Sequence, residues 1–468
     1  MQIKITFLGA AKNVTGSRYL VQANDFNFLV DCGLYQERNL KARDWAPFPV
    51  YPHNIDAVLL THAHLDHCGY LPKLVKEGFN NSIYCTAATA DITEVMLMDA
   101  AHLQMQDSEN KKRRHDRAGR KGPHPELPLY TTEDAEDCLQ HLTSVPYQHT
   151  IRLAKGISAT FYDAGHVLGA AMIEVRIEQN GDERILLFSG DIGRQNKPIL
   201  NDPTVFNTAD YVLTEATYGD RSLDPPDSMF QKLVDVVNST VAAGGNIVIP
   251  SFALERAQDI LYYLSQALDA KKIKPIKVLL DSPMAVDITK IFSRHIDLFD
   301  EEMKILLKQG KSPFTFPGLK CMTSVEDSKS INHLTEPAII ISGSGMCNGG
   351  RIKYHLVENI ARPESTILFV GYQAVDTLGR QITDGARTVR ILGQNYQVNA
   401  KIVKLNGFSS HADKDELLAW ISALKRPPRQ VFVVHGEESA ANTYAESIRT
   451  STGWKVTVPD YLEEFVLG

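Results

Sequence analysis

A short stretch at residues 62–67, with the pattern H-x-H-x-D-H, holds the side chains with the clearest chemistry in this sequence. Histidine nitrogens and carboxylate oxygens are the usual ligands of catalytic metals in hydrolases. His62 and His64 alternate along an extended or turning backbone, whereas Asp66 and His67 are adjacent and can diverge towards a second point. In two-metal hydrolases the ions lie about 3.5–4 Å apart, so one short loop can serve both. The spacing therefore favours two ions over one.

Two later segments add further metal-ligating residue types after predicted strands. Residues 163–169 (D-A-G-H-V-L-G) place His166 between glycines, and residues 188–193 (F-S-G-D-I-G) place Asp191 in the same kind of turn. Each residue alone would more often be an ordinary turn residue than a ligand. Together with the first stretch they supply a third histidine for one ion and a carboxylate able to bridge both.

Asp31 stands where another predicted buried strand, residues 28–30, runs out. A carboxylate at this position can cap the segment that follows. It can also accept a hydrogen bond from a ligating histidine and so fix the orientation of that ring. The sequence leaves both interpretations open.

The composition is that of an ordinary globular protein, and the 468-residue length predicts two domains. The N-terminus has an alternating strand pattern without the apolar core of a signal peptide, and no apolar run reaches membrane-spanning length. The six cysteines are scattered and form no C-x-x-C pair, so the sequence indicates neither a disulfide framework nor a thiolate zinc site and favours a reducing cytoplasm. A formal net charge of −7 means that any contact with nucleic acid must come from a local surface.

Helices and strands alternate along the first half of the chain, which predicts an α/β layered domain. Helices are expected at residues 71–79 and 89–110, and strands at residues 83–86, 157–162 and 171–177. The basic residues 111–121 follow the second helix. They are interpreted either as a solvated loop or as a contact to a phosphate backbone.

From about residue 221 the pattern becomes βαβ alternation, which predicts a separate, inserted domain with a parallel sheet. Its most informative part, residues 339–352, combines a buried strand, a glycine-rich loop and the start of a helix. Such a loop exposes backbone N–H groups beside a positive helix terminus and suits a phosphate, although glycine-rich turns are common. The residues assigned to phosphate or RNA binding on this basis, and on the similar segment 367–380, are Ser342, Gly343, Ser344, Gly345, Met346, Gly349, Gly350, Arg351, Gly379 and Arg380.

Taken together, these motifs resemble the metallo-β-lactamase fold, and more closely its β-CASP branch of nucleases. This branch includes the endonuclease subunit of the messenger-RNA cleavage and polyadenylation machinery and its prokaryotic relatives. The resemblance covers nearly the whole chain. It rests on H-x-H-x-D-H, Asp31, the motifs around His166 and Asp191, E-A-T-Y-G-D at 215–220, S-P-M-A at 282–285, the loop at 342–351, S-H-A-D at 410–413 and H-G-E at 435–437.

The resemblance implies a four-layer αββα sandwich, with a β-CASP domain that contains a parallel sheet inserted before its last elements. The expected limits are residues 1–219 and 400–468 for the metallo-β-lactamase domain and residues 220–399 for the insert.

The resemblance also implies two zinc ions per chain. One is expected on His62, His64, His166 and Asp191, and the other on Asp66, His67, Asp191 and His435. Such metals lower the pKa of a bridging water towards 7 and neutralise charge on phosphoryl oxygens. Glu215 is expected to keep His411 protonated so that His411 donates to the leaving oxygen. Asp66 is alternatively the base that positions the attacking water.

Members of the branch that act on RNA resemble this chain in having a histidine at the position of His435. The main prediction is therefore a ribonuclease that hydrolyses phosphodiesters of single-stranded RNA. The resemblance is also compatible with a homodimer, although no interface signature stands out. One departure is Asp376, which stands where the family usually has a glycine in G-Y-Q-A-x-G-T-x-G-R. Its carboxylate would weaken or reshape substrate binding.

Two alternative functions compete with this prediction. A hydrolase of the same fold that cleaves a thioester, lactone or lactam would need only the first domain. It would leave the glycine-rich loop and His411 without a role. A noncatalytic scaffold that binds RNA or a partner nuclease is disfavoured, because inactive relatives lose metal ligands and every ligand position is filled in this chain.

Overall fold

The chain forms two compact units, which are described separately. The structure is a computed structural model that describes residues 2–119, 126–374 and 376–468. Unit 1 comprises Met1–Gln195, Asp202–Ser222 and His411–Gly468, and unit 2 comprises Asn196–Asn201 and Leu223–Ser410. The predicted domain limits at 219/220 and 399/400 stay predictions.

The first sheet of unit 1 has the strand order β22-β1-β2-β3-β4-β5-β6. Its N-terminal strands pair antiparallel, whereas β3 to β6 pair in parallel. The strands are β1 (Ile3–Phe7), β2 (Tyr19–Ala23), β3 (Phe26–Val30), β4 (Ala57–Leu59), β5 (Ser82–Cys85), β6 (Leu142–Ser144) and β22 (Glu464–Leu467).

The second sheet of unit 1 has the order β21-β20-β11-β10-β9-β8-β7. The antiparallel meander β7 to β10 leads into a parallel section made of β10, β11, β20 and β21. The strands are β7 (Thr150–Ala154), β8 (Ile157–Asp163), β9 (Ala171–Gln179), β10 (Asp182–Phe188), β11 (Tyr211–Glu215), β20 (Gln430–Val434) and β21 (Val456–Thr457). Every residue of β11 and β20 is buried, as expected for central parallel strands covered on both faces.

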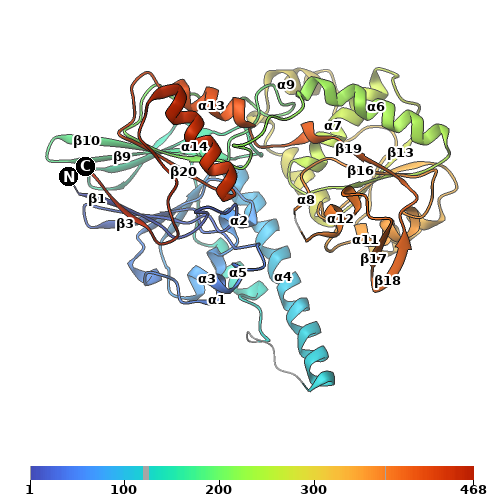
Figure 1. Ribbon diagram of the computed structural model, residues 1–468, viewed down its shortest axis with the longest axis horizontal. Coiled ribbons are helices and arrows are strands. Elements are labelled where there is room, and N and C mark those ends of the chain that lie inside the picture. The colour runs from blue at the N-terminus through green and yellow to red at the C-terminus, as the bar shows by residue number, and fades with distance from the viewer. Residues whose placement is uncertain (1, 120–125, 375) are drawn as a thin grey trace. The chain divides into compact units, whose positions relative to one another are not determined.

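The two sheets of unit 1 pack face to face over one apolar core. Phe7 and Phe28 from the first sheet meet Phe161, Phe188 and Phe432 from the second. The ring centroids of Phe7 and Phe432 lie 5.2 Å apart. Helices cover the outer faces, which completes the predicted αββα layering (Figure 1). They are α1 (Ala42–Trp45), α2 (Leu65–Cys68), α3 (Leu71–Lys76), α4 (Ala87–Ala118), α5 (Thr132–Leu139), α13 (Lys414–Ser422) and α14 (Glu438–Thr452).

Helix α4 is longer than the sequence predicted. Residues Lys111 to Ala118 of the basic stretch continue the helix. The interpretation of these residues as a solvated loop was therefore wrong. Basic side chains near a helix C-terminus complement the partial negative charge of the last carbonyl groups, which favours this continuation. The helix ends where Gly119 takes a left-handed conformation with φ +60. Arg120 and Lys121, the last residues of the basic stretch, lie outside the described residues.

Unit 2 contains the predicted parallel sheet, with the order β14-β13-β15-β12-β16-β19. All of its strand pairs are parallel. The strands are β12 (Ile247–Pro250), β13 (Lys277–Asp281), β14 (Leu319–Cys321), β15 (Ala338–Ser342), β16 (Thr366–Phe369) and β19 (Lys401–Lys404); β17 (Thr388–Ile391) and β18 (Gln394–Gln397) form a separate hairpin.

Helices flank both faces of this sheet (Figure 1). Ile352 and Leu356 of one helix and Ile382 of another pack with Ile340 and Ile367 of the strands on one side. The helices of unit 2 are α6 (Pro226–Ala242), α7 (Arg256–Asp269), α8 (Pro283–Phe292), α9 (Glu301–Lys308), α10 (Val325–Ser330), α11 (Ile352–Asn359) and α12 (Leu378–Thr383).

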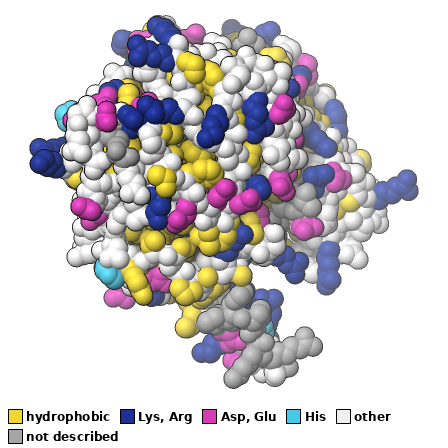
Figure 2. Space-filling model, turned by 60° about the vertical axis from the view of Figure 1, so that its left-hand side comes forward, with side chains coloured by type: hydrophobic (Ala, Val, Ile, Leu, Met, Phe, Trp, Pro, Cys, Tyr) yellow, Lys and Arg dark blue, Asp and Glu magenta, His cyan; other side chains and the backbone are white. Residues whose placement is uncertain are grey.

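Charges of both signs are mixed on the molecular surface. Figure 2 shows Lys and Arg side chains scattered among Asp and Glu side chains on the face that it displays. This mixture agrees with the modest net charge of −7. Within the described part of the chain, no helix combines the length and the low polarity needed to cross a membrane.

Candidate metal centre

The predicted metal ligands of unit 1 all lie at or just beyond strand ends. His62 and His64 follow β4, and the short helix α2 begins at once and carries Asp66 and His67. Asp191 and His435 follow β10 and β20. Strands β10, β11 and β20 are parallel neighbours, so their carboxyl ends meet at one edge of the sheet. His166 follows β8 at the same sheet.

A first group of four donors consists of His62, His64, His166 and Asp191, whose ligand atoms lie within 4.8 Å of one another. The Nδ1 atom of His64 lies 3.0 Å from the Nε2 atom of His62 and 3.3 Å from that of His166. The Oδ2 atom of Asp191 lies 3.4 Å from the Nε2 atom of His62 and 3.5 Å from that of His166. Tetrahedral zinc with bonds of about 2.1 Å has ligand atoms about 3.4 Å apart. The spacing fits one tetrahedral ion.

A second group consists of Asp66, His67 and His435. The Nε2 atoms of His67 and His435 lie 3.1 Å apart, and the Nε2 atom of His435 lies 3.5 Å from the Oδ2 atom of Asp66. The Oδ1 atom of Asp191 lies 3.3 Å from the Nε2 atom of His67. Asp191 therefore turns one carboxylate oxygen to each group, as a bridging ligand would.

The carboxylate of Asp191 also provides a direct test of whether a metal fits. Its Oδ1 atom is buried and makes no hydrogen bond within the described residues, although ring nitrogens of His67 and His435 face it at 3.3 and 3.4 Å. A buried carboxylate oxygen without a donor is costly unless a cation compensates its charge. The two donor groups therefore suit metal ions at both positions.

Burial determines the protonation state of the first histidine group. It lowers the pKa of His62 to about 3 and that of His64 to about 4, and it lowers the pKa of His166 well below the usual 6.5. These imidazoles are therefore neutral at pH 7, which is the form that binds a metal.

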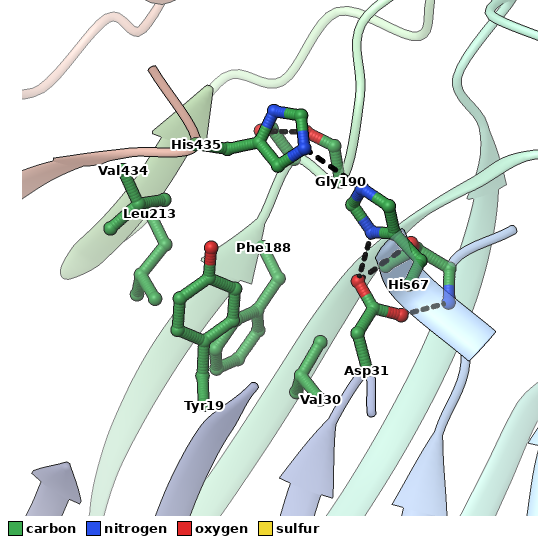
Figure 3. Close-up of a pocket in the computed structure, with 11 residues that line it drawn as sticks. Tyr19, Val30, Asp31, His67, Phe188, Gly190, Leu213, Val434 and His435 are labelled. Carbon is green, nitrogen blue, oxygen red and sulfur yellow. Dashed lines mark hydrogen bonds and ion pairs between the residues drawn. The ribbon is translucent and has the colours of Figure 1, made fainter. Parts of the chain in front are cut away.

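The carboxylate of Asp31 contacts the Nδ1 atom of His67, the ring nitrogen opposite to the one that faces the second donor group (Figure 3). Its Oδ2 atom lies 2.7 Å from the Nδ1 atom of His67 and accepts a 2.8 Å hydrogen bond from the Thr61 hydroxyl. The Thr61 amide donates to the other oxygen at 2.7 Å. Asp31 is 1% exposed and adopts φ +60, a left-handed conformation that costs energy for a residue other than glycine. The contacts match the orienting alternative for Asp31.

Glu215 and His411 form the predicted pair beside the first donor group. The Nδ1 atom of His411 lies 3.3 Å from the carboxylate of Glu215, which is fully buried. Glu215 also accepts a 2.6 Å hydrogen bond from the Ile192 amide. The Ala412 amide donates to the Ile192 carbonyl at 2.7 Å, which ties the His411 segment to the Asp191 loop. Burial acts against the charged form of His411, but Glu215 raises the net pKa of the ring above its usual value.

Two threonines and a tyrosine at this site were missed from sequence. The Thr61 hydroxyl lies 3.1 Å from the Nδ1 atom of His62, and the Thr217 hydroxyl lies 3.1 Å from the Nδ1 atom of His435. Both hydroxyls orient a ring whose other nitrogen faces a donor group. Tyr19 lines a cavity of about 10 Å³ with Asp31, His67 and His435 (Figure 3). Thr61 directly precedes His62, and Thr217 stands two residues after Glu215, so these positions could have pointed to the two threonines. No sequence signal pointed to Tyr19.

The glycine-rich loop predicted to bind phosphate lies in unit 2, and several of its polar groups bond within the loop. The Ser344 amide donates to the Gly349 carbonyl at 3.4 Å, and the Gly349 amide donates to the Ser344 hydroxyl, also at 3.4 Å. The Ser342 hydroxyl donates to the Asp281 carbonyl. The Gly379 amide donates to the Met346 carbonyl at 3.1 Å, so the two predicted segments are neighbours.

Both arginines predicted to bind phosphate have acidic partners. The Nη1 atom of Arg351 lies 2.7 Å from Asp281 and also donates to the Met322 carbonyl. The Nε atom of Arg380 lies 2.8 Å from Asp384. Arg351 is held more tightly, because Asp281 is fully buried, whereas Arg380 and Asp384 are both partly exposed.

The fold and the buried histidine and aspartate cluster define a metallohydrolase of the metallo-β-lactamase fold. Residues 20–216 match the metallo-beta-lactamase superfamily domain, residues 257–382 match the Beta-Casp domain, and residues 395–459 match the Zn-dependent metallo-hydrolase RNA specificity domain. The chain therefore belongs to the β-CASP family of metallo-β-lactamase proteins.

Curated relatives agree with this membership. The chain is 39% identical to ribonuclease TTHA0252 of Thermus thermophilus, over 93% of this chain and 94% of that protein. It is 31% identical to the transcription termination factor FttA of Methanocaldococcus jannaschii, over 98% of this chain and 71% of that protein. A crystal structure of a protein of unknown function from Enterococcus faecalis shares the fold, with a TM-score of 0.56, 14% identity and full coverage of both chains.

Proposed function

We propose that this protein is a dizinc ribonuclease that hydrolyses phosphodiester bonds of single-stranded RNA. The observation that carries the proposal is the pair of donor groups joined by Asp191, whose spacing fits two ions. The 39% identity to a protein named a ribonuclease supports the substrate class. The match of residues 395–459, which include His435, to an RNA specificity domain supports it further.

Each side chain of the centre has a distinct role in this proposal. Bound zinc would lower the pKa of a coordinated water and neutralise charge on the phosphoryl group. His62, His64, His166 and Asp191 would hold one ion, and Asp66, His67, His435 and Asp191 the other. Alternatively, Asp66 would be the base that positions the attacking water. These two roles of Asp66 stay open alternatives.

His411 is the proposed general acid. Glu215 lies beside the Nδ1 atom of His411, so it fixes the tautomer and directs the opposite nitrogen, Nε2, to the substrate. The raised pKa favours the protonated form of the ring. The protonated ring can then donate to the leaving oxygen. This step needs no movement of Glu215, because the Ile192 amide already holds its carboxylate.

A substrate panel tests the proposal. Wild-type protein is incubated with single-stranded RNA, single-stranded DNA, a thioester, a lactone and a β-lactam. We expect cleavage of RNA, and we expect Asp191→Ala to lose bound metal and RNA cleavage together. Asp182→Ala, in an exposed hairpin on the same sheet, is the matched control and should behave like wild type.

The other outcomes of the panel identify the competing functions. Hydrolysis of a small ester without RNA cleavage would replace the proposal with a hydrolase of the same fold. RNA binding with no cleavage of any substrate by the zinc-loaded protein would indicate a scaffold. RNA cleavage that persists in Asp191→Ala without bound metal would contradict the role of the metal centre.

Two further features of the proposal concern the protein in the cell. A reducing cytoplasm is proposed because the six cysteines are all free. A homodimer stays a prediction, which light scattering of the purified protein would test directly.

A further inference from the structure

Three loops of unit 2 start at the same edge of its parallel sheet. Strand β12 lies between β15 and β16, and all three run in the same direction. The loops after Ser342, Pro250 and Phe369 therefore begin side by side. Ligands of open α/β sheets usually bind at this carboxyl edge of the strands.

Two of these loops expose an aromatic ring. Phe252, two residues after β12, is 44% exposed, and Tyr372, three residues after β16, is 39% exposed. By contrast, Phe292, Phe299 and Phe369 of the same unit are fully buried. Exposed rings at a ligand-binding edge indicate a surface that a flat apolar group can cover.

The glycine-rich loop lies against the Phe252 ring and is hydrogen-bonded to the Tyr372 loop. A Cβ atom added to Gly345 would lie 3.0 Å from the Phe252 ring, so a larger residue at this position would require the ring to shift. The side-chain amide of Gln373 donates to the carbonyls of Gly345 and Tyr372, each at 3.1 Å. This link joins the Tyr372 loop to the glycine-rich loop, against which the Phe252 ring lies.

Few cationic side chains beside the rings are available to attract a polyanion. The Tyr372 side chain interacts with the partly exposed side chain of Arg380. Arg351 is already paired with the buried Asp281, and the chain has a net charge of −7, so ionic contacts alone provide limited attraction for a polyanion. Stacking of bases on aromatic rings adds affinity that does not depend on net charge.

We propose that Phe252 and Tyr372 form a base-stacking site for single-stranded RNA beside the glycine-rich loop. This inference rests on the proposed function and names how the substrate is recognised. Every base has a π face, so stacking tolerates any sequence. The site therefore selects unpaired bases and not a particular sequence. Within a duplex the bases are stacked on one another and cannot cover the rings.

The test measures binding of a fluorescent, nuclease-resistant phosphorothioate RNA to the zinc-loaded, full-length protein. Phe252→Ala and Tyr372→Ala should each raise Kd roughly tenfold, the effect typical of losing one stacked base. Phe252→Leu should bind like Phe252→Ala, because it keeps an apolar side chain but has no π face. Tyr354→Ala is the matched control. Tyr354 is a 59% exposed aromatic residue on α11 of unit 2, and its removal should leave the Kd for RNA unchanged.

RNAs with a single abasic position separate stacking from a structural effect. Wild-type protein should lose about tenfold in affinity when the base that stacks is absent. Phe252→Ala combined with Tyr372→Ala should bind abasic and intact RNA equally. Abasic discrimination that survives in this double variant, or wild-type affinity in Phe252→Leu, would overturn the stacking site while RNA cleavage by wild type still stands. Wild-type protein that neither binds nor cleaves RNA would overturn the proposed function itself.

Discussion

Asp191 illustrates how a single side chain can couple two metal positions. One of its oxygens faces His62 and His166, and the other faces His67. The sequence predicted a bridging carboxylate because Asp191 lies in a glycine-flanked turn after a predicted strand and supplies the carboxylate that residues 62–67 lack. The structure adds the distances that fit two tetrahedral ligand sets.

Asp31 should control the affinity for the metal at His67. Asp31→Asn keeps the shape but removes the charge that orients the ring, so we expect metal affinity to fall about 10–100-fold. Competition with a chelator of known affinity measures this change. Asp56→Asn, at an exposed turn carboxylate that caps the Asn27 amide, is the control and should leave affinity unchanged. Unchanged affinity in Asp31→Asn would contradict the orienting role.

His411 should contribute to the chemical step but not to metal binding. His411→Ala should retain metal and lose about 10²–10⁴-fold in kcat, the range for a general acid. Single-turnover cleavage together with metal analysis measures both quantities, and His53→Ala at an exposed site is the control. Wild-type turnover in His411→Ala, with chemistry rate-limiting, would exclude this role.

The pair with Glu215 predicts the pH dependence of cleavage. The pKa of His411 lies above its usual value because of Glu215, so the acid form persists to a higher pH than in an ordinary histidine, and kcat falls as the pH rises through that pKa. Glu215→Gln removes the charge that raises the pKa. We therefore expect the alkaline limb of the kcat profile to move to lower pH. An unmoved limb would show that another group sets it.

Helix α7 carries a buried acidic cluster that the sequence did not reveal. Lys197 lies 2.8 Å from Glu255 and 3.5 Å from Asp259, so one cation faces two carboxylates. Burial raises the pKa of Asp259 to about 7, and Lys197 offsets this only in part because Glu255 adds a like charge. Arg256 also faces the group. The folded protein therefore holds a proton on Asp259 that the unfolded chain releases near pH 4.

The stability of unit 2 should consequently fall as the pH rises. A raised folded-state pKa gives a stabilising contribution that is complete below the unfolded pKa and lost as the pH passes about 7. Asp259→Asn removes this dependence, so its denaturation midpoint should change less than that of wild type between pH 5 and pH 8. The difference amounts to on the order of a few kcal/mol. Asp235→Asn is the control, because Asp235 is an exposed residue of α6. Parallel pH profiles of stability for wild type and Asp259→Asn would contradict the raised pKa of Asp259.

At the scale of elements, periodicity predicted most strands and helices, but their ends depended on tertiary contacts. The helix expected at residues 89–110 runs from Ala87 to Ala118. Its start is set by the Thr86 hydroxyl, which caps the Thr89 amide and donates to the Gly169 carbonyl. Such contacts between distant residues leave no local sequence signal.

At the scale of the whole molecule, the layered α/β fold with a parallel sheet in the second unit was predicted correctly. Strand-end histidines and aspartates gave most of the candidate site, because ligands at strand ends follow recognisable buried runs. Thr61 and Thr217 stand close in sequence to predicted site residues, but which ring each hydroxyl orients could not be predicted, and neither could the pairing of Arg351 with Asp281. Each depends on which segments the fold brings together.

The central claim is that two zinc ions held by this cluster cleave RNA. The direct measurement titrates zinc into chelator-treated protein and follows both bound zinc and cleavage of single-stranded RNA labelled at both ends. We predict that cleavage is absent without metal and reaches its maximum at about two zinc ions per chain. Full RNA cleavage by protein that contains no metal, or no cleavage after two equivalents of zinc have bound, would contradict the account.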